Sequence, residues 1–300
     1  MNLPQLASEY LACRLGLSQA YRSTVLSVCR RIHKDMGLIN GSMPTKAQIV
    51  GWLQRQLDLG KSPATVAIYR RILRAVIRWG AAEGHCLPIS LPPIRQTQKP
   101  PEAWTVEQVS RILHVASKQP GLIAGRSAAD WWTALILLIY WTGARIGSVL
   151  EIRPADYDPI KQTLTIRRTK TGKQTVCRLH DQAAQAIKQI YDAMADRLFI
   201  WPHHRRTLWA AFRRIVEQAG VPAPKNTRTG LFHRLRKTCL SYCWAADPAI
   251  AQRQADHSSA EITRRHYVDP RLVQAEARQA ADVLPVPDWQ PGPQQRFLFS

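Results

Sequence analysis

Two arginines and a histidine between residues 145 and 236 have the types and spacing needed to bind an anion. Arg145 follows a Thr-Gly-Ala turn in "TGARIGSVLEI", after an apolar run, where a guanidinium is costly unless an anion meets it. In "GLFHRLRKTCLSYCW", His233 and Arg236 are three residues apart and share one face of a predicted helix. Arg145 and Arg236 could clamp one phosphate, although either arginine alone is more often part of a structural ion pair.

A tyrosine with possible chemistry lies in the segment "DHSSAEITRRHYVDP", residues 256–270. Tyr267 comes ten residues after His257 and follows the basic pair Arg264 and Arg265 closely. A tyrosine in such surroundings is most often an interfacial side chain with a solvated hydroxyl. Its own segment therefore favours an interfacial role, and other segments must decide whether the hydroxyl reacts.

The charge of the chain indicates the class of its partner. The 300 residues carry 42 Lys and Arg against 21 Asp and Glu, a net charge of +21. A charge of this size points to a polyanion, and to a nucleic acid rather than a membrane because no lysine-rich amphipathic helix dominates. Residues 1–100 hold 14 of the basic and 4 of the acidic residues, so the N-terminal third is the densest cation.

Composition also indicates the size of the domains and the cellular compartment of the protein. A hydrophobic content of 45% suits one large or two ordinary domains with their own cores. The six cysteines follow no paired spacing, as expected of reduced intracellular thiols. The longest apolar run, "WWTALILLIYW", is shorter than the roughly 20 residues of a membrane span, and no signal pattern opens the chain. We expect a cytoplasmic protein, associated with the nucleoid, that has no membrane partner.

The elements that must position these residues divide at a proline-rich stretch. The prolines of "LPISLPPIRQTQKPPEAW" predict a linker at residues 94–103, after an N-terminal domain of residues 1–93. That domain is predicted to be all-helical, with amphipathic helices at 45–57 and 62–84, the second opened by Ser62 and Pro63. Four arginines at helical spacing form either a solvated face or a phosphate-contacting face, with about equal support for each: Arg70, Arg71, Arg74 and Arg78.

The second domain, residues 104–285, is predicted to be mainly α with a small β-sheet. Thr105 and Gln108 have capping-box spacing at the start of a helix over 105–117, and the apolar residues 131–144 predict a buried helix. Residues 163–179 read as a hairpin with its turn near Gly172, and helical patterns return from 181 onward. A helix is predicted at 270–284, and prolines make residues 286–300 an irregular tail.

Four segments together resemble a known family. "TGARIGSVLEI", the "KTGK" hairpin, "HRLRKT" and "DHSSAEITRRHYVDP" are similar in order and spacing to the catalytic boxes of tyrosine recombinases, the phage-integrase family. Each box alone is weak, but four in sequence are specific. The resemblance covers Thr105 to Pro270 and implies a tyrosine-recombinase catalytic domain, preceded by a SAM-like helical core DNA-binding domain. It further implies a site-specific recombinase of integrase or resolvase type that acts on double-stranded DNA.

The resemblance implies a role for each matching residue. Tyr267 looks like the nucleophile that forms a 3′-phosphotyrosine, which conserves bond energy so that no ATP is needed. Arg145 and Arg236 look like the pair that binds the non-bridging oxygens of the scissile phosphate. Their charge would replace that of a metal ion, so no metal or other cofactor is implied. A docking C-terminal segment in the family's cyclic tetramers implies a homotetramer on synapsed DNA, with residues 286–300 docking between subunits.

The proton carriers follow from the same resemblance. Lys170 matches the hairpin lysine that protonates the departing 5′ oxygen, and it competes with Lys173, which is otherwise a solvated turn lysine or a DNA contact. His233 matches a histidine that assists proton movement, and His257 matches one that hydrogen-bonds the phosphate. His266 is interpreted as a packing or phosphate-side neighbour of the tyrosine.

Two departures and three alternatives accompany the resemblance. Ser148 stands where the family commonly has an acidic residue, and Asp256 stands where it has glycine. A type IB topoisomerase shares the chemistry without synapsis of two sites, and a non-catalytic DNA-binding protein would not need the full catalytic set. A zinc site is the third alternative, with His233, Cys239, Cys243 and His257 as ligands, but this spacing fits no common structural site.

Overall fold

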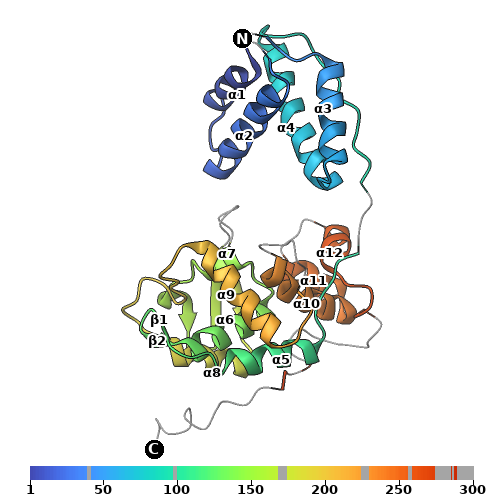
Figure 1. The fold of residues 1–300 in the computed structure, drawn as a ribbon. Helices are drawn as coiled ribbons and strands as arrows, with labels where there is room; N and C mark the ends of the chain where they lie inside the picture. Colours follow the sequence, from blue (N-terminus) through green and yellow to red (C-terminus); the bar gives the residue numbers. More distant parts are fainter. Residues whose placement is uncertain are drawn as a thin grey trace, which may run out of the picture. The chain divides into compact units, whose positions relative to one another are not determined.

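The computed structural model divides into two compact units, Met1–Lys99 and Pro100–Ser300 (Figure 1). It describes residues 1–38, 42–96, 100–167, 174–223, 230–255 and 259–273, together with Pro285, Pro287 and Asp288. The division falls inside the stretch 94–103, where the prolines predict a linker. No helix in these described ranges is long and apolar enough to cross a membrane.

The described part of the first unit is helical. Its helices are α1 (Leu3–Ala12), α2 (Gln19–Asp35), α3 (Lys46–Asp58) and α4 (Pro63–Ala82). A polar side chain caps each N-terminus by accepting a backbone N–H: Asn2, Ser18, Thr45 and Ser62. The predicted helices at 45–57 and 62–84 are thereby confirmed, including Pro63 in the first turn of α4.

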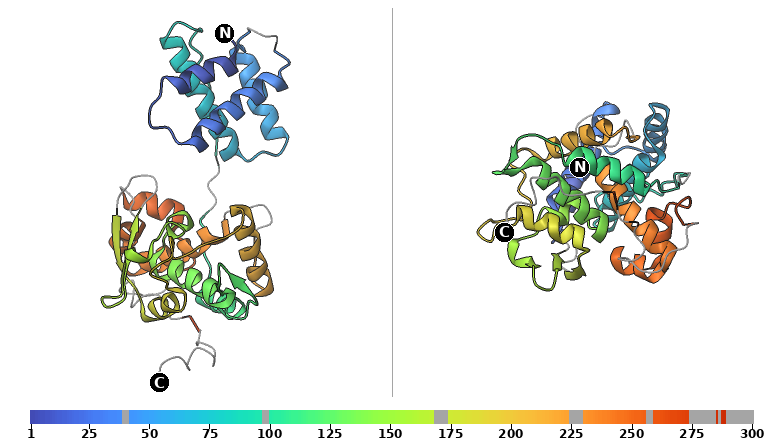
Figure 2. Two further views of the ribbon diagram at one scale, coloured as in Figure 1. Left: turned by 90° about the vertical axis from the view of Figure 1, so that its left-hand side faces the viewer. Right: turned by 90° about the horizontal axis from the view of Figure 1, so that it is seen from below.

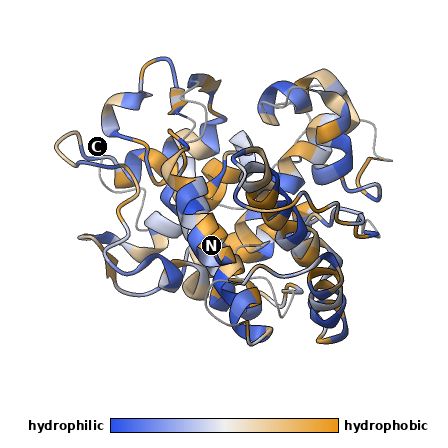
Figure 3. Cartoon of the chain, turned by 90° about the horizontal axis from the view of Figure 1, so that it is seen from above, coloured by the Kyte–Doolittle hydropathy of each residue, from blue (hydrophilic) through white to orange (hydrophobic). Residues whose placement is uncertain are grey.

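The helices of the first unit pack through one apolar face each. Figure 3 shows helices that carry both hydrophobic and hydrophilic residues, as amphipathic helices do. Leu6, Trp52 and Leu73 are buried in the shared core. At Gly80 of α4 an added Cβ would lie 2.7 Å from a methyl of Leu6, so glycine lets α4 approach α1 closely.

The second unit is mainly α with two small antiparallel sheets, which confirms the predicted fold class. Its helices are α5 (Val106–Ala116), α6 (Ala128–Thr142), α7 (Ile146–Val149), the 3-10 helix η1 (Pro154–Asp156), α8 (Asp181–Ile190), α9 (Arg205–Gln218), α10 (Gly230–Ala246), α11 (Pro248–Ala255) and α12 (Ala260–Tyr267). Its strands are β1 (Leu122–Ile123), β2 (Arg126–Ser127), β3 (Tyr157–Asp158), β4 (Thr163–Arg167) and β5 (Gln174–Arg178).

Helix α6 forms the centre of this unit. Every residue from Trp131 to Thr142 is buried, because a helix that is apolar on all sides must be covered on all sides. Helices α5, α8 and α10 pack against it. The predicted buried helix is confirmed, and so is the capping box of Thr105 and Gln108 that starts α5.

The predicted hairpin is present in its two arms. Strands β4 and β5 pair antiparallel, with Leu164 opposite Cys177, and β3 extends the sheet beyond β4. Figure 2 shows these strands at one side of the second unit. The tip of the hairpin, residues 168–173 with the predicted turn near Gly172, lies outside the described residues.

Two residues near the start of the predicted tail, Pro287 and Asp288, contact the second unit of the same chain. The Gln182 side chain donates to the Pro287 carbonyl at 3.3 Å, and the Asp288 N–H donates to Ser110 Oγ at 2.9 Å. The predicted helix at 270–284 lies mostly outside the described residues, as do residues 289–300. Docking of the tail between subunits stays a prediction.

Candidate active site

The turn that ends α6 places Arg145. Gly143 adopts a left-handed conformation with φ of 60°, and its N–H closes the helix on the Ile139 carbonyl at 2.8 Å. An added Cβ at Gly143 would also lie 3.1 Å from the Cys239 sulfur. Both the backbone angle and this close packing require glycine. Arg145 is the N-cap residue of α7 two positions later, and its side chain is exposed.

The second arginine is buried and held by main-chain oxygens. Arg236 on α10 is only 2% exposed. Its guanidinium donates from Nη1 to the Gly143 carbonyl at 2.5 Å and from Nη2 to the Ala255 carbonyl at 3.0 Å. These bonds join the end of α6 and the end of α11 to α10. They leave the position of the guanidinium little freedom, which suits a group that must meet an anion without reorganisation.

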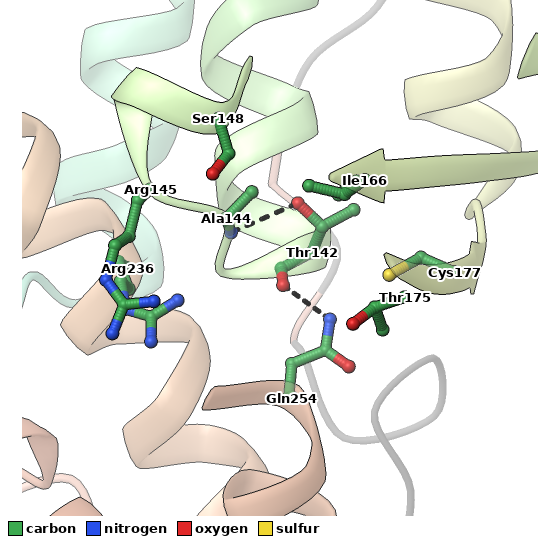
Figure 4. Close-up of a pocket in the computed structure, with 9 residues that line it drawn as sticks. All are labelled: Thr142, Ala144, Arg145, Ser148, Ile166, Thr175, Cys177, Arg236 and Gln254. Atoms are coloured by element: carbon green, nitrogen blue, oxygen red, sulfur yellow. Dashed lines mark hydrogen bonds between the residues drawn. The ribbon is translucent and has the colours of Figure 1, made fainter. Parts of the chain in front are cut away.

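Arg145 and Arg236 line one small pocket of about 20 Å³ (Figure 4). The other lining residues come from the end of α6, from α7, from strands β4 and β5 and from α11: Thr142, Ala144, Ser148, Ile166, Thr175, Cys177 and Gln254. The Gln254 side chain donates to the Thr142 carbonyl, which ties α11 to the turn. Ser148, which stands where the family commonly has an acidic residue, is buried in this lining.

Tyr267 ends α12 and lies against the α10 face that carries His233 and Arg236. The Tyr267 and His233 ring centroids are 5.0 Å apart at an interplanar angle of 61°. The Arg236 guanidinium carbon lies 5.0 Å from the Tyr267 ring centroid, within the range of a cation–π contact. The fold therefore brings Tyr267 to His233 and Arg236, and the ring is only partly buried, which leaves it accessible.

Burial and the surrounding positive charges together set the protonation state of His233. Burial lowers the pKa of His233 to about 4, with further lowering by Lys237, Arg236 and Arg145. The imidazole is therefore neutral at pH 7 and able to accept a proton. Lys237, one helical turn after His233, has its own pKa lowered by burial and by Arg234.

The backbone beyond Tyr267 is anchored by two residues that the sequence patterns do not single out. Ser241 Oγ accepts the N–H of Asp269 at 2.8 Å and donates to the Tyr267 carbonyl at 3.3 Å. The buried Asp269 carboxylate accepts the N–H of Ala103 at 2.9 Å. The only sequence signal for Asp269 is the segment "YVDPR", in which an Asp precedes an Arg by two positions. Such a pair is common on protein surfaces, so the sequence does not indicate that this aspartate is buried.

The other predicted site residues lie either outside the described residues or on α4. Lys170, Lys173, His257 and Asp256 lie outside the described residues. Arg70 donates from two nitrogens to the Leu91 carbonyl, at 3.2 and 2.6 Å, and so holds the chain that follows α4. The remaining three arginines of the predicted basic face are exposed on α4: Arg71, Arg74 and Arg78.

A second tyrosine near the site and the zinc alternative can be compared with the geometry. Tyr242 on α10 is buried, and burial raises the pKa of its hydroxyl, whereas Tyr267 is accessible. No group of three or more His, Cys, Asp and Glu side chains within the described ranges could hold a metal ion. His257, one of the four side chains of the zinc alternative, lies outside those ranges.

Two arginines line one pocket, with a tyrosine and a neutral histidine beside Arg236, and these residue types are suited to binding a phosphate. Residues 102–272 match the phage integrase family, and the chain belongs to this family of tyrosine-type site-specific recombinases. The tyrosine recombinase XerC of Corynebacterium glutamicum is 26% identical over 297 residues, covering 89% of this chain and 88% of XerC. The type 1 fimbriae regulatory protein FimE of Escherichia coli K12 is 31% identical over 143 residues, covering 44% of this chain and 71% of FimE.

Solved structures share the fold. A lambda integrase(75–356) dimer bound to a COC′ core site superposes with a TM-score of 0.72 at 21% identity, covering 90% of this chain and 96% of that chain. A lambda integrase tetramer bound to a Holliday junction has a TM-score of 0.69 at 21% identity, covering 87% of this chain and 76% of that chain. The Tn1549 transposon integrase in complex with circular intermediate DNA has a TM-score of 0.68 at 18% identity, covering 89% of this chain and 95% of that chain.

Proposed function

We propose that this recombinase cleaves and rejoins DNA strands through a covalent 3′-phosphotyrosine at Tyr267. The observation that carries the proposal is the placement of the Tyr267 ring 5.0 Å from both the His233 ring and the Arg236 guanidinium of the same chain. Arg236 and Arg145 line one pocket beside it. A nucleophile, a proton acceptor and two phosphate ligands thus come from three separate segments of sequence.

The bond changes follow from these positions. The Tyr267 oxygen attacks the phosphorus, the bond from phosphorus to the 5′ oxygen breaks, and the 3′ end stays on the enzyme. A 5′ hydroxyl from another strand reverses the step and releases Tyr267. Arg145 and Arg236 hydrogen-bond the non-bridging oxygens, where negative charge develops. Because the guanidiniums supply this charge and the phosphotyrosine conserves the bond energy, we propose a reaction without metal or ATP.

Two side chains transfer protons in this proposal, and a third binds the phosphate. His233 lies against the Tyr267 ring with a neutral imidazole, and it is the proposed acceptor of the Tyr267 proton. Lys170 donates a proton to the departing 5′ oxygen. His257 hydrogen-bonds the phosphate. The roles of Lys170 and His257 rest on the family resemblance, because both residues lie outside the described part of the chain.

The proposed substrate is a specific site in double-stranded DNA of the nucleoid, bound by a homotetramer. A net charge of +21 suits a polyanionic partner, and the exposed Arg71, Arg74 and Arg78 are the proposed phosphate contacts of the first unit, with Lys173 in the second. Lambda integrase forms a dimer on a core site and a tetramer on a Holliday junction in its solved structures. Synapsis of two sites by four subunits is the corresponding arrangement proposed for this chain.

A covalent trapping experiment tests the nucleophile. Tyr267→Phe should retain DNA affinity and form no adduct with a nicked suicide substrate on a denaturing gel, because only the hydroxyl is lost. Tyr242→Phe is the matched control and should form the adduct. An adduct in Tyr267→Phe that disappears in Tyr242→Phe would move the nucleophile to α10.

A further inference from the structure

The nucleophile helix α12 has little apolar packing to hold it. It has eight residues, of which only Thr263 is buried. A helix this short does not persist by itself, and its position must come from other contacts. The residues just beyond it are the opposite: Val268 is 5% exposed and Asp269 is 1% exposed. The backbone directly after Tyr267 is therefore a buried point of attachment for this helix.

The Asp269 carboxylate joins two parts of the chain at this point. Its Oδ2 accepts the Ala103 N–H at 2.9 Å and Arg271 Nη2 at 2.6 Å, and its Oδ1 accepts the Arg271 N–H and Nε, each at 3.0 Å. Although burial alone would raise it, these donors hold the pKa of Asp269 below its ordinary value. The Arg271 side chain is 71% exposed, so its pairing is solvent-screened, while the bond to Ala103 is buried.

Helix α10 supplies the second half of the anchor. Ser241 bonds to the Tyr267 carbonyl and to the Asp269 N–H, two helical turns after His233, which faces the Tyr267 ring. Thr238 on the same helix accepts the Trp104 N–H at 2.9 Å. Residues 103–104, α10 and the turn after α12 therefore form a closed set of hydrogen bonds around the backbone of the tyrosine.

We propose that Asp269 is a positioning residue for Tyr267. Together with Ser241, it fixes the C-terminal end of α12 to α10 and to the segment at Ala103, so that the Tyr267 hydroxyl stays beside His233 and Arg236 of its own subunit. This inference rests on the proposed nucleophile. Its consequence is that the rate of cleavage depends on Asp269, although the carboxylate is buried and takes no part in the proposed bond changes.

The test uses the full-length protein with Asp269→Asn, which keeps the shape and removes one strong acceptor. At saturating suicide substrate, the single-turnover rate of adduct formation should fall by about 10- to 100-fold, since displacement of a reacting group by about 1 Å has effects of this size. The half-saturating DNA concentration should stay within about twofold of the parent, because the lost bond orders the nucleophile only. Arg271→Ala is the matched control, since it removes only the exposed partner of the same carboxylate, and its rate should stay near the parent.

A spectroscopic readout separates positioning from stability and from the identity of the nucleophile. With 3-fluorotyrosine at position 267, the parent protein should give one narrow ¹⁹F resonance without DNA, and Asp269→Asn and Ser241→Ala should each give broadened or multiple resonances. An unchanged resonance or an unchanged adduct rate in both variants overturns the inference. If Tyr267→Phe still forms an adduct, the proposed nucleophile fails instead, and the ¹⁹F comparison still reports on the anchor.

Discussion

Acid should destabilise this protein through His233 in a measurable way. The pKa of His233 is about 4 in the folded chain, chiefly because of burial and then because of Lys237, Arg236 and Arg145. An unperturbed histidine has a pKa of about 6.5, so the unfolded chain takes up the proton first as pH falls. The stability that depends on a neutral His233 is thus complete above pH 6.5 and is lost as pH falls towards 4.

The size of the effect follows from the two pKa values. The full difference corresponds to about 3 kcal/mol of unfolding free energy, and about 2 kcal/mol of it should be lost between pH 6.5 and 4.5. Other groups titrate in the same range, so the parent must be compared with a variant that lacks only this titration. His233→Gln is suitable because glutamine stays neutral and polar.

Urea unfolding of the parent and His233→Gln, at pH 6.5 and 4.5 and constant ionic strength, measures the difference. The parent should lose about 2 kcal/mol more than the variant over this interval. Lys237→Gln should show a smaller acid loss than the parent, because removing the nearby ammonium raises the pKa of His233. Equal losses in the parent and His233→Gln would refute the depressed pKa and the neutral proton acceptor derived from it.

Three further predictions concern the reaction and the assembly. If Lys170 is the general acid, Lys170→Ala should cleave ordinary DNA at least about 100-fold more slowly than the parent, and should recover on a substrate with sulfur at the 5′ bridging position. Lys173→Ala should resemble the parent on both substrates. Rescue of Lys173→Ala alone would reassign the acid. If Tyr267 serves the Arg236 of its own subunit, mixed Tyr267→Phe and Arg236→Ala proteins should form no adduct, and an adduct above that of either protein alone would show exchange between subunits. Deleting 289–300, which keeps the described contacts of Pro287 and Asp288, should leave binding to one site intact and reduce synapsis in a native gel; full recombination by the truncated protein would contradict docking by the tail.

The parts of the fold that could be predicted from sequence are those with local causes. Thr105 and Gln108 cap α5 because the two side chains lie within one turn of the backbone they bond. The apolar run from Trp131 could only be a buried helix, since its length and composition suit neither a strand nor a membrane span. The segments around Arg145, Arg236 and Tyr267 could be recognised because their residue types and their order along the chain resemble those of one family.

The contacts that complete the site could not be predicted, because they join segments far apart in the chain. Nothing near Arg236 in sequence indicates that its guanidinium meets the Gly143 and Ala255 carbonyls. The helical spacing of Arg70 left a solvated face and a phosphate-contacting face equally open, and it does not indicate that the Arg70 guanidinium also donates to the Leu91 carbonyl.

Local sequence therefore determined which helices form, where they begin and end, and which residue types could carry the reaction. Only the tertiary structure decided that Ser241 and Asp269 hold the backbone at Tyr267, and that burial and the distant Arg145 lower the pKa of His233. The physical reason is range. Helix propensity and capping act within one turn of the chain, whereas hydrogen bonds and charges act across whatever distance packing leaves between α10 and α12, and packing depends on the whole core.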